Sequence, residues 1–286
     1  MHRFLPAGRR STRSRTVAII VPVADRDRFL AEEELSLRHL THYLGAYDKY
    51  LIVPAGREIR RDGFSTLTVP RKFVGSPAAH GNMMMWRPLY RHFRRYEYLF
   101  LYHLDSLVFS GDLLTWCQAG YDYIGAPWLP CPETPWVTEP GVGNGGCTLF
   151  RVPSIRHVLR VRHRREPLTW VLDCLGRNMP RLTPIYSVID RVHRRWPRAL
   201  LERVLAHRAR ALDPAKYGTA SDHFWSLQAR RYVPSFRVAS VDEALGFAFE
   251  AAPRECFERN GRRLPFGCHA WEKFDRAFWE PFLLRD

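Results

Sequence analysis

Asp105 and His103 are the residues whose types and spacing most directly suggest chemistry in this chain. They follow the run Tyr-Leu-Phe-Leu-Tyr at residues 98–102, which is apolar and aromatic enough to predict a buried strand. Residues two apart lie on the same side of an extended strand, so we expect the two side chains to lie together near its end. A carboxylate is costly to bury unless it is paired, and a divalent cation would pair with it. The alternative is that Asp105 caps the turn that follows the strand.

A glycine-rich segment, Gly-Asn-Gly-Gly at residues 143–146, is the second candidate. It lacks the Lys-Ser/Thr of a P-loop and the GxGxxG spacing of dinucleotide-binding folds. Clustered glycines permit positive φ and let backbone N–H groups approach a ligand closely. The segment therefore predicts either a ligand contact or a tight hairpin before a strand at residues 147–150.

Asp222 and His269 are further candidates, and each pattern is open to two interpretations. Asp222 stands before an aromatic helical run, where it either caps a helix or takes a proton from an acceptor hydroxyl. His269 is either a packed core histidine or, near a carboxylate, a ligand of a metal such as manganese. The sequence contains no GxSxG or HExxH motif, and no closely spaced pair of carboxylates marks a glycosidase, so serine-hydrolase, zincin and glycosidase chemistry lack support.

The elements that would position these residues alternate between apolar runs and helical periodicity. Strands are predicted at residues 17–23, 50–53, 67–69, 98–104, 121–128, 147–150 and 238–241, and helices at 32–43, 82–96, 112–120, 154–165 and from 221 onwards. This alternation predicts an α/β fold with a mostly parallel sheet flanked by helices. Ligands bind beyond the carboxyl ends of the strands in such sheets, and Asp105 would lie there.

The composition indicates one folded domain. A chain of 286 residues with 46% hydrophobic and 13% aromatic residues is not generally disordered. The longest aliphatic run, at residues 17–23, is too short to cross a bilayer, and residues 1–15 lack the apolar core of an export signal. The six cysteines form no CxxC pair, which indicates reduced thiols rather than a zinc site. We therefore expect a cytoplasmic protein.

The net charge of +15 is unevenly distributed along the chain. Residues 1–15 hold five Arg and no acid, and residues 156–210 hold fourteen Arg and four acids, so the remaining residues are neutral in sum. We predict a basic disordered tail at residues 1–15 and a basic helical insertion at 156–210, within a single domain at 16–286. A pI of about 10.0 also permits a nucleic-acid-binding protein, although no aromatic residues are interleaved with the arginines in a recognised module.

Taken in order, these segments resemble a bacterial domain family of uncharacterised function that is related to GT-A glycosyltransferases. The resemblance is carried by His-Leu-Asp-Ser at 103–106, Tyr-Asp-Tyr-Ile-Gly-Ala-Pro-Trp at 121–128, Gly-Asn-Gly-Gly at 143–146, Ser-Asp at 221–222 and Pro-Phe-Gly-Cys-His at 265–269. It spans roughly residues 17–271. It implies a GT-A-like, Rossmann-related domain and a hexosyltransferase-like enzyme that moves a sugar from a nucleotide-sugar donor to an acceptor hydroxyl.

In GT-A enzymes an Asp-x-Asp motif binds the donor ribose and a Mn²⁺ or Mg²⁺ ion that bridges the diphosphate. Only the last acid of that motif is matched, by Asp105, and His103 stands where the first would be. The resemblance implies that Asp105 and His269 hold the metal and that Asp222 is the base of an inverting reaction. The residues expected to contact donor or acceptor are Pro22, His103, Trp128, Asn144, Gly145 and Gly146.

The expected partners follow from the same resemblance. They are a UDP- or GDP-linked donor and a glycan or lipid-linked acceptor in glycan or cell-envelope polysaccharide synthesis. For the basic insertion we expect either contact with anionic lipids at the inner face of the membrane or an ordinary solvated helical face. A catalytically inactive sugar-nucleotide binder, since His103 replaces an acid, and a nucleic-acid-binding protein are the alternatives to an enzyme.

Overall fold

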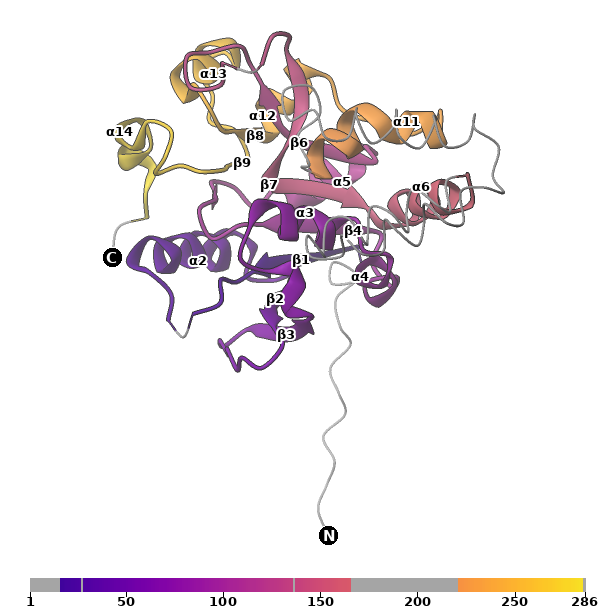
Figure 1. Cartoon of the computed structure of the whole chain (residues 1–286). Helices are drawn as coiled ribbons and strands as arrows, with labels where there is room; N and C mark the ends of the chain where they lie inside the picture. Colours follow the sequence, from indigo (N-terminus) through magenta and orange to yellow (C-terminus); the bar gives the residue numbers. More distant parts are fainter. Residues whose placement is uncertain (1–15, 27, 136, 166–220, 285–286) are drawn as a thin grey trace, which may run out of the picture.

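The computed structural model describes residues 16–26, 28–135, 137–165 and 221–284 of the chain (Figure 1). The predicted basic tail at residues 1–15 and residues 166–210 of the predicted insertion lie outside this part. Within the described residues, no helix is both long and apolar enough to cross a membrane.

A six-stranded sheet forms the centre of the described structure, with strand order β3-β2-β1-β4-β7-β6. The strands are β1 (Val17–Pro22), β2 (Asp48–Pro54), β3 (Phe64–Val69), β4 (Tyr98–Tyr102), β6 (Tyr123–Trp128) and β7 (Gly141–Arg151). The first four strands run parallel, and β7 runs antiparallel to both of its neighbours. The predicted α/β fold with a mostly parallel sheet is therefore confirmed.

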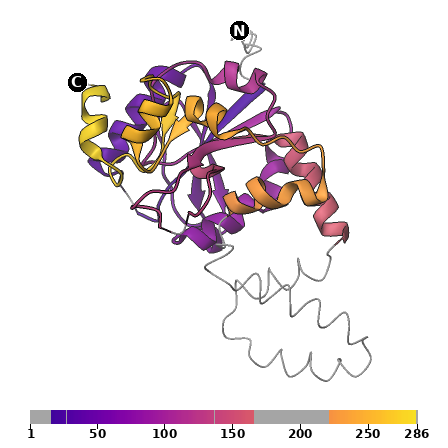
Figure 2. The same cartoon turned by 90° about the horizontal axis from the view of Figure 1, so that it is seen from above.

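Helices cover both faces of this sheet, which explains why its central strands are apolar along their whole length (Figures 1 and 2). Along β1, Val17, Ile19 and Val21 face one layer, and Ala18 and Ile20 face the other. The first layer consists of α2 (Ala31–Leu44), α5 (Leu113–Gln118) and α12 (Val241–Phe247). The second consists of α3 (Pro77–Met84), α4 (Arg87–His92), α6 (Val152–Arg165) and α11 (Ala229–Tyr232).

A second, small sheet joins the C-terminal part of the chain to the end of β4. It has the order β5-β9-β8, with β5 (Leu107–Val108), β8 (Ala248–Phe249) and β9 (Gly267–Cys268). Its core includes Leu107, Phe249, Cys268, Trp271 and Trp279, all of them buried. Because β9 pairs with β5, which directly follows the turn after β4, residues 267–271 lie beside residues 103–107.

The helix predicted at residues 82–96 is wrong as a single element. The structure has two helices there, α3 and α4, separated at Met85 and Trp86. Trp86 has extended backbone angles and Pro88 lies in the first turn of α4. Proline has no N–H to donate and its ring clashes with the carbonyl four residues earlier, so it is accommodated in the first turn of a new helix and not in the interior of a continuous one.

The strand predicted at residues 98–104 is too long. The strand β4 ends at Tyr102, and His103, Leu104 and Asp105 form a turn in which the Ser106 N–H donates to the His103 carbonyl at 3.0 Å. The two candidate side chains are thus brought together by a turn and not by the pleat of a strand.

Two further predictions are corrected. The glycine segment 143–146 is neither a loop nor a separate hairpin, because it lies inside β7, paired with β6 across an irregular register at Gly125–Pro127. The strand predicted at residues 238–241 is reduced to one bridge between Val238 and Tyr123. Ser240 ends it, since its hydroxyl accepts from the Glu243 N–H and caps α12.

Candidate functional site

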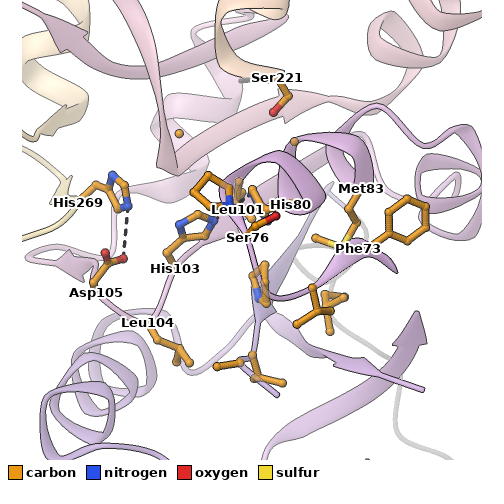
Figure 3. A pocket seen from close by; sticks show the side chains of 18 of the residues that line it. Phe73, Ser76, His80, Met83, Leu101, His103, Leu104, Asp105, Ser221 and His269 are labelled. Atoms are coloured by element: carbon orange, nitrogen blue, oxygen red, sulfur yellow. Dashed lines mark hydrogen bonds and ion pairs between the residues drawn. The ribbon is translucent and has the colours of Figure 1, made fainter. Parts of the chain in front are cut away.

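A cavity of about 580 Å³ lies at the carboxyl ends of β1 and β4 (Figure 3). Its wall is built by the segment after β1, by α3 and the residues before it, by the turn after β4, by β7 and by the start of α10 (Ser221–His223). Seven of the residues singled out from the sequence line it: Pro22, His103, Asp105, Asn144, Gly145, Asp222 and His269. The fold therefore gathers at one place residues that are spread over almost the whole chain.

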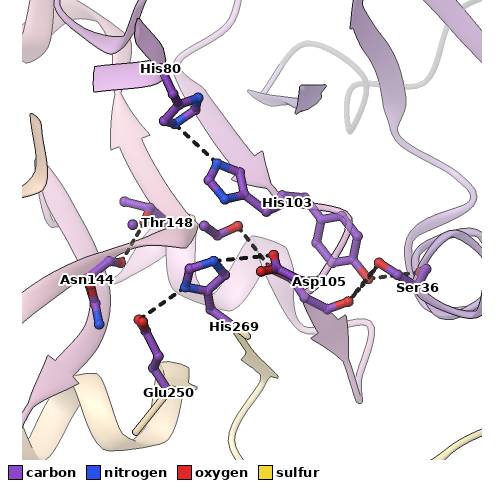
Figure 4. Close-up of polar contacts among 12 residues, drawn as sticks. Ser36, His80, His103, Asp105, Asn144, Thr148, Glu250 and His269 are labelled. Carbon is purple, nitrogen blue, oxygen red and sulfur yellow. Dashed lines mark hydrogen bonds and ion pairs between the residues drawn. The ribbon is translucent and has the colours of Figure 1, made fainter. Parts of the chain in front are cut away.

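His269 lies between two carboxylates (Figure 4). Its Nε2 is 3.3 Å from Asp105 Oδ1, and its Nδ1 is 3.1 Å from Glu250 Oε2. The backbone fixes this arrangement, because the His269 N–H donates to the Phe249 carbonyl at 2.9 Å and the Trp271 N–H donates to the Asp105 carbonyl at 3.2 Å. The small sheet thus determines where the imidazole stands relative to Asp105.

The charges of His269 and Asp105 stabilise one another. Burial disfavours the charged form of His269, but Glu250 and then Asp105 raise its pKa well above the usual value. Burial also disfavours ionisation of Asp105, but the charge and hydrogen bond of His269 and the proximity of His103 bring its pKa below the usual value. Each of the two groups therefore favours the charged form of the other at the edge of the cavity, where the Asp105 side chain is 48% exposed, and a cation bound at His269 Nε2 would displace the proton there.

A second histidine, His80 on α3, contacts His103. The two Nε2 atoms are 3.1 Å apart, so one ring donates a hydrogen bond to the other. Burial, followed by the nearby charge of His269, lowers the pKa of His80 to about 4, and burial together with His80 lowers the pKa of His103 well below its usual value. Both rings are therefore neutral at physiological pH.

The donor set of His103, Asp105 and His269 fits a divalent cation. One ligand atom from each residue can be chosen such that all three lie within 4.8 Å of one another. Imidazole nitrogen and carboxylate oxygen are ligands of divalent metals, including Mn²⁺. The sequence assigned the metal to Asp105 and His269 alone, and the structure adds His103 to their cluster.

Gly146 is needed to leave room for His269. Its φ is +100°, and a Cβ atom on its backbone would lie 2.1 Å from His269 Cδ2. Its carbonyl accepts from the His103 N–H at 2.7 Å and from the Ser106 hydroxyl at 3.1 Å, which attaches β7 to the turn after β4. Gly146 therefore stands behind the imidazole and is not part of the cavity wall.

Asp222 is attached to the glycine segment. Its Oδ2 accepts from the Gly145 N–H at 3.3 Å and its Oδ1 accepts from the His223 N–H at 2.9 Å. A π-helical turn, η3 (Phe224–Gln228), follows directly and carries Trp225 into the core. The carboxylate is therefore held by two backbone donors at the cavity wall.

Trp128 is the other predicted contact residue that does not line the cavity. It ends β6, and its ring lies 4.7 Å from that of His223. The six-membered part of the ring covers Gly141, where an added Cβ would lie 2.8 Å from Trp128 Cε3. Trp128 thus packs beside the end of α10 rather than against the space where a donor would bind.

The cavity is acidic. The described residues of its lining include Glu32, Glu33, Asp105, Asp222 and Glu272, and none of these described lining residues is Lys or Arg. All three glutamates have arginine partners outside the wall, since Glu33 pairs with Arg26, and Glu32 and Glu272 lie 3.8 and 3.5 Å from Arg276. The strongly basic composition of the chain is therefore not found at this site.

His80 and Glu250 are the site residues that sequence reasoning missed. His80 is one histidine on a short helix, placed by the Ser76 hydroxyl, which accepts from the Ala79 N–H at 3.1 Å and caps α3. Glu250 follows the two-residue strand β8, and no motif surrounds it. Because both act on a histidine through contacts distant in sequence, no signal in the sequence could have identified them.

Comparison with known proteins places the chain among uncharacterised relatives. Residues 63–269 match the model of a family described as "Protein of unknown function (DUF5672)". No curated protein matches the chain. Among solved structures, the apo-form glycosyltransferase GlyE of Streptococcus pneumoniae TIGR4 is similar with a TM-score of 0.43 and 12% identity. The match covers 95% of this chain and 61% of GlyE, so the chain spans less than two thirds of that structure.

Proposed function

The chain belongs to this family of unknown function, whose model matches more than half of it, and we propose that it is a glycosyltransferase that uses a nucleotide sugar as donor. One observation carries the proposal. A single cavity at the carboxyl ends of parallel strands combines a cluster of metal-ligand type with a carboxylate, Asp222, that backbone N–H groups hold at its wall. Ligands bind at this edge of parallel sheets.

The acidic wall determines how an anionic donor would be accepted. The part of the lining that the structure describes has carboxylates and no Lys or Arg, so the two phosphates of a UDP- or GDP-sugar meet no basic side chain from that part of the wall. A divalent cation, Mn²⁺ or Mg²⁺, held by Asp105 and His269 would supply the positive charge that stabilises the departing diphosphate. The nucleoside would pack on the apolar side of the cavity, where Pro22, Ile52 and Phe73 lie.

Asp222 is the proposed base. It takes the proton from the acceptor hydroxyl as the hydroxyl oxygen attacks the anomeric carbon, and the configuration at that carbon is inverted. The Gly145 and His223 N–H groups fix the orientation of the carboxylate, so that its reach does not depend on a free side-chain rotation. The proposed acceptor is a glycan or a lipid-linked sugar of the cell envelope.

The test is release of nucleoside diphosphate from UDP- and GDP-sugars in the presence of Mn²⁺. We expect metal-dependent release by the wild-type protein and a reduction on the order of 10²- to 10³-fold in Asp105→Asn. Asp62→Asn is the matched control, because Asp62 is an exposed carboxylate in the turn before β3 and outside the cavity lining.

Three outcomes would contradict the proposal in different ways. Undiminished release by Asp105→Asn would remove that carboxylate from the reaction. Donor binding without release or transfer would identify an inactive sugar-nucleotide binder. Binding of arbitrary DNA with a steep salt dependence, in the absence of donor binding, would identify a nucleic-acid-binding protein.

A further inference from the structure

The histidine pair next to Asp105 bears on which cation the cavity accepts. His103 stands beside Asp105 and His269, and the rings of His103 and His269 have centroids 5.2 Å apart. On the far side of His103, the His80 ring lies with its centroid 4.5 Å away. The described residues thus place two imidazoles and one carboxylate around one point, with a third imidazole behind them (Figure 4).

We propose that His103 is the third ligand of the cation and that the resulting set of two imidazoles and one carboxylate selects a first-row transition metal over Mg²⁺. This inference rests on the proposed function only for the existence of the metal site. Mg²⁺ is bound by carboxylates, phosphates and several retained waters, and it dehydrates reluctantly. Imidazole nitrogen favours the transition metals, whose affinity rises from Mn²⁺ to Co²⁺ and beyond. A histidine where an acid would stand therefore changes the preferred ion.

His80 acts as a positioning residue for His103. One nitrogen of the His103 ring, Nε2, is engaged with His80 at 3.1 Å, which fixes the ring and leaves its second nitrogen for a cation. The backbone of His103 is fixed as well, because its N–H donates to the Gly146 carbonyl at 2.7 Å. His269 has an equivalent support in Glu250, 3.1 Å from its Nδ1. Both imidazoles are thus supported on the side away from Asp105.

The test is calorimetric titration of MnCl₂, CoCl₂, ZnCl₂ and MgCl₂ into the metal-stripped full chain, without nucleotide. We expect Mn²⁺, Co²⁺ and Zn²⁺ to bind at least about tenfold more tightly than Mg²⁺. His103→Asp restores an oxygen ligand and should bring Mg²⁺ to within roughly tenfold of Mn²⁺ while weakening Co²⁺. His80→Gln should weaken Co²⁺ by about 10- to 100-fold. His157→Asp is the control, since His157 is an exposed histidine on α6, and it should leave all four affinities unchanged.

Equal affinity of the wild-type protein for Mg²⁺ and Co²⁺ would overturn the inference, and so would an unchanged metal preference in His103→Asp. If His80→Gln fails to fold, the metal preference of His103→Asp still tests the inference. Selective binding of Co²⁺ with no turnover of any nucleotide sugar would refute the proposed function and leave the metal preference intact. Turnover supported equally by Mg²⁺ would refute the metal preference and leave the function intact.

A different observation concerns the surface formed by three neighbouring helices. The helix α6 packs between α4 and α11, and the buried side chains of all three belong to one core cluster (Figure 1). The residue ranges 87–96, 152–165 and 229–237 contain no Asp or Glu. The exposed arginines on these segments include Arg87, Arg91, Arg94, Arg160, Arg164 and Arg231, which together we call the basic helical face. The described residues offer none of these six an acidic partner.

We infer that the basic helical face binds anionic membrane lipids. Its charge is complementary to a leaflet rich in phosphate headgroups, which attracts Lys and Arg side chains near its surface. The Phe and Tyr residues of these segments, Tyr90, Phe93, Tyr96, Tyr232 and Phe236, are buried, so the face has no exposed Phe or Tyr ring on which bases of a single strand would stack. The observations therefore favour a lipid surface over a single-stranded nucleic acid.

Flotation of the full chain with vesicles at low salt tests this inference. We expect flotation with vesicles that contain phosphatidylglycerol and none with phosphatidylcholine alone. Arg160→Glu/Arg164→Glu should reduce binding by at least about tenfold. Arg28→Glu/Arg60→Glu, which reverses two exposed arginines in the loops after β1 and β2, should not reduce it. Equal flotation with both vesicle types, equal loss in both variants, or binding to duplex DNA in place of vesicles would overturn it.

Discussion

The cavity and the basic helical face have opposite charge although they belong to one chain with a net charge of +15. The described residues of the cavity wall include five carboxylates, three imidazoles of which His80 and His103 are neutral, and no Lys or Arg, whereas the three helices of the basic helical face have no acid. The comparison shows that the net charge of the whole chain reflects its outer surface and does not predict the charge at the cavity wall. It agrees with the two tasks proposed above, a cation-dependent reaction in the cavity and attachment to lipid through the helices.

The largest expected effect concerns the cavity alone. Asp222→Asn keeps the side-chain size and removes the base, so we expect sugar transfer to fall by about 10²- to 10⁴-fold. Donor affinity and vesicle flotation should be unchanged, since Asp222 lies neither in the metal-ligand cluster nor on the basic helical face. Steady-state kinetics with and without anionic vesicles would measure this, and a parallel loss of flotation would show that the two regions are not independent.

A substitution behind the cavity should remove its metal site without changing any charge. Gly146→Ala places a Cβ at φ +100° and 2.1 Å from the His269 ring, so it should displace the imidazole and destabilise the fold by roughly 2–5 kcal/mol. Gly63→Ala is the matched control, because Gly63 also has a positive φ, +77°, but a Cβ there would meet nothing within 4 Å. The free energy of unfolding of Gly63→Ala should decrease by only about 1 kcal/mol.

Urea unfolding of the two glycine variants measures the difference, and Co²⁺-dependent thermal shifts show whether the site survives. Equal destabilisation, or a full metal response in Gly146→Ala, would contradict the view that this glycine exists to accommodate His269.

A smaller effect is expected from the support of His269. Glu250→Gln keeps the shape but removes the carboxylate 3.1 Å from Nδ1, and loss of such a partner weakens metal affinity by about 10- to 100-fold. Calorimetric titration of Co²⁺ would detect it. Glu58→Gln provides the control, since Glu58 is an exposed glutamate between β2 and β3. An affinity equal to that of the wild type would leave Glu250 with a packing role only.

The smallest expected effect is a difference in how strongly salt weakens vesicle binding and metal binding. Exposed charges are screened over about 10 Å at 0.1 M salt and over about 3 Å at 1 M, and partly buried pairs are screened less. We expect vesicle binding to decrease several-fold when salt is raised, while Co²⁺ binding in the cavity changes little. Flotation and calorimetry at matched salt concentrations check this. A larger loss of Co²⁺ binding than of vesicle binding would reverse the comparison.

The sheet could be predicted from the sequence because its central strands are long apolar runs with helical periodicity between them. The predictions that failed concern elements whose bounds are set by tertiary contacts or by single residues. Pro88 divides the helix predicted at 82–96, and Ser240 ends the strand predicted at 238–241. The strands of the small sheet have two residues each, too few to show any period.

The sequence pointed to those residues of the candidate site whose side-chain types suggest chemistry by themselves. It did not point to the residues that matter only through the side chains that they contact. Asp105 and His269 stand together as the sequence suggested, but through β5 and β9 and a turn after β4, not through the pleat of a strand. His80 and Glu250 matter because of the histidines that they contact, and such contacts between distant segments cannot be found in one sequence. The catalytic roles of these residues, and the ligand contacts of Pro22 and Asn144, stay predictions.

The central claim is that an acidic cavity accepts an anionic nucleotide only together with a cation. Calorimetric titration of UDP and GDP into the full chain, with Mn²⁺ and with a chelator, tests it most directly. We predict that Mn²⁺ strengthens binding of the preferred nucleotide by at least about tenfold and that the nucleotide strengthens Mn²⁺ binding by the same factor, as thermodynamic linkage requires. Binding of either nucleotide with equal affinity in the chelator, or no binding of either with Mn²⁺, would contradict the account.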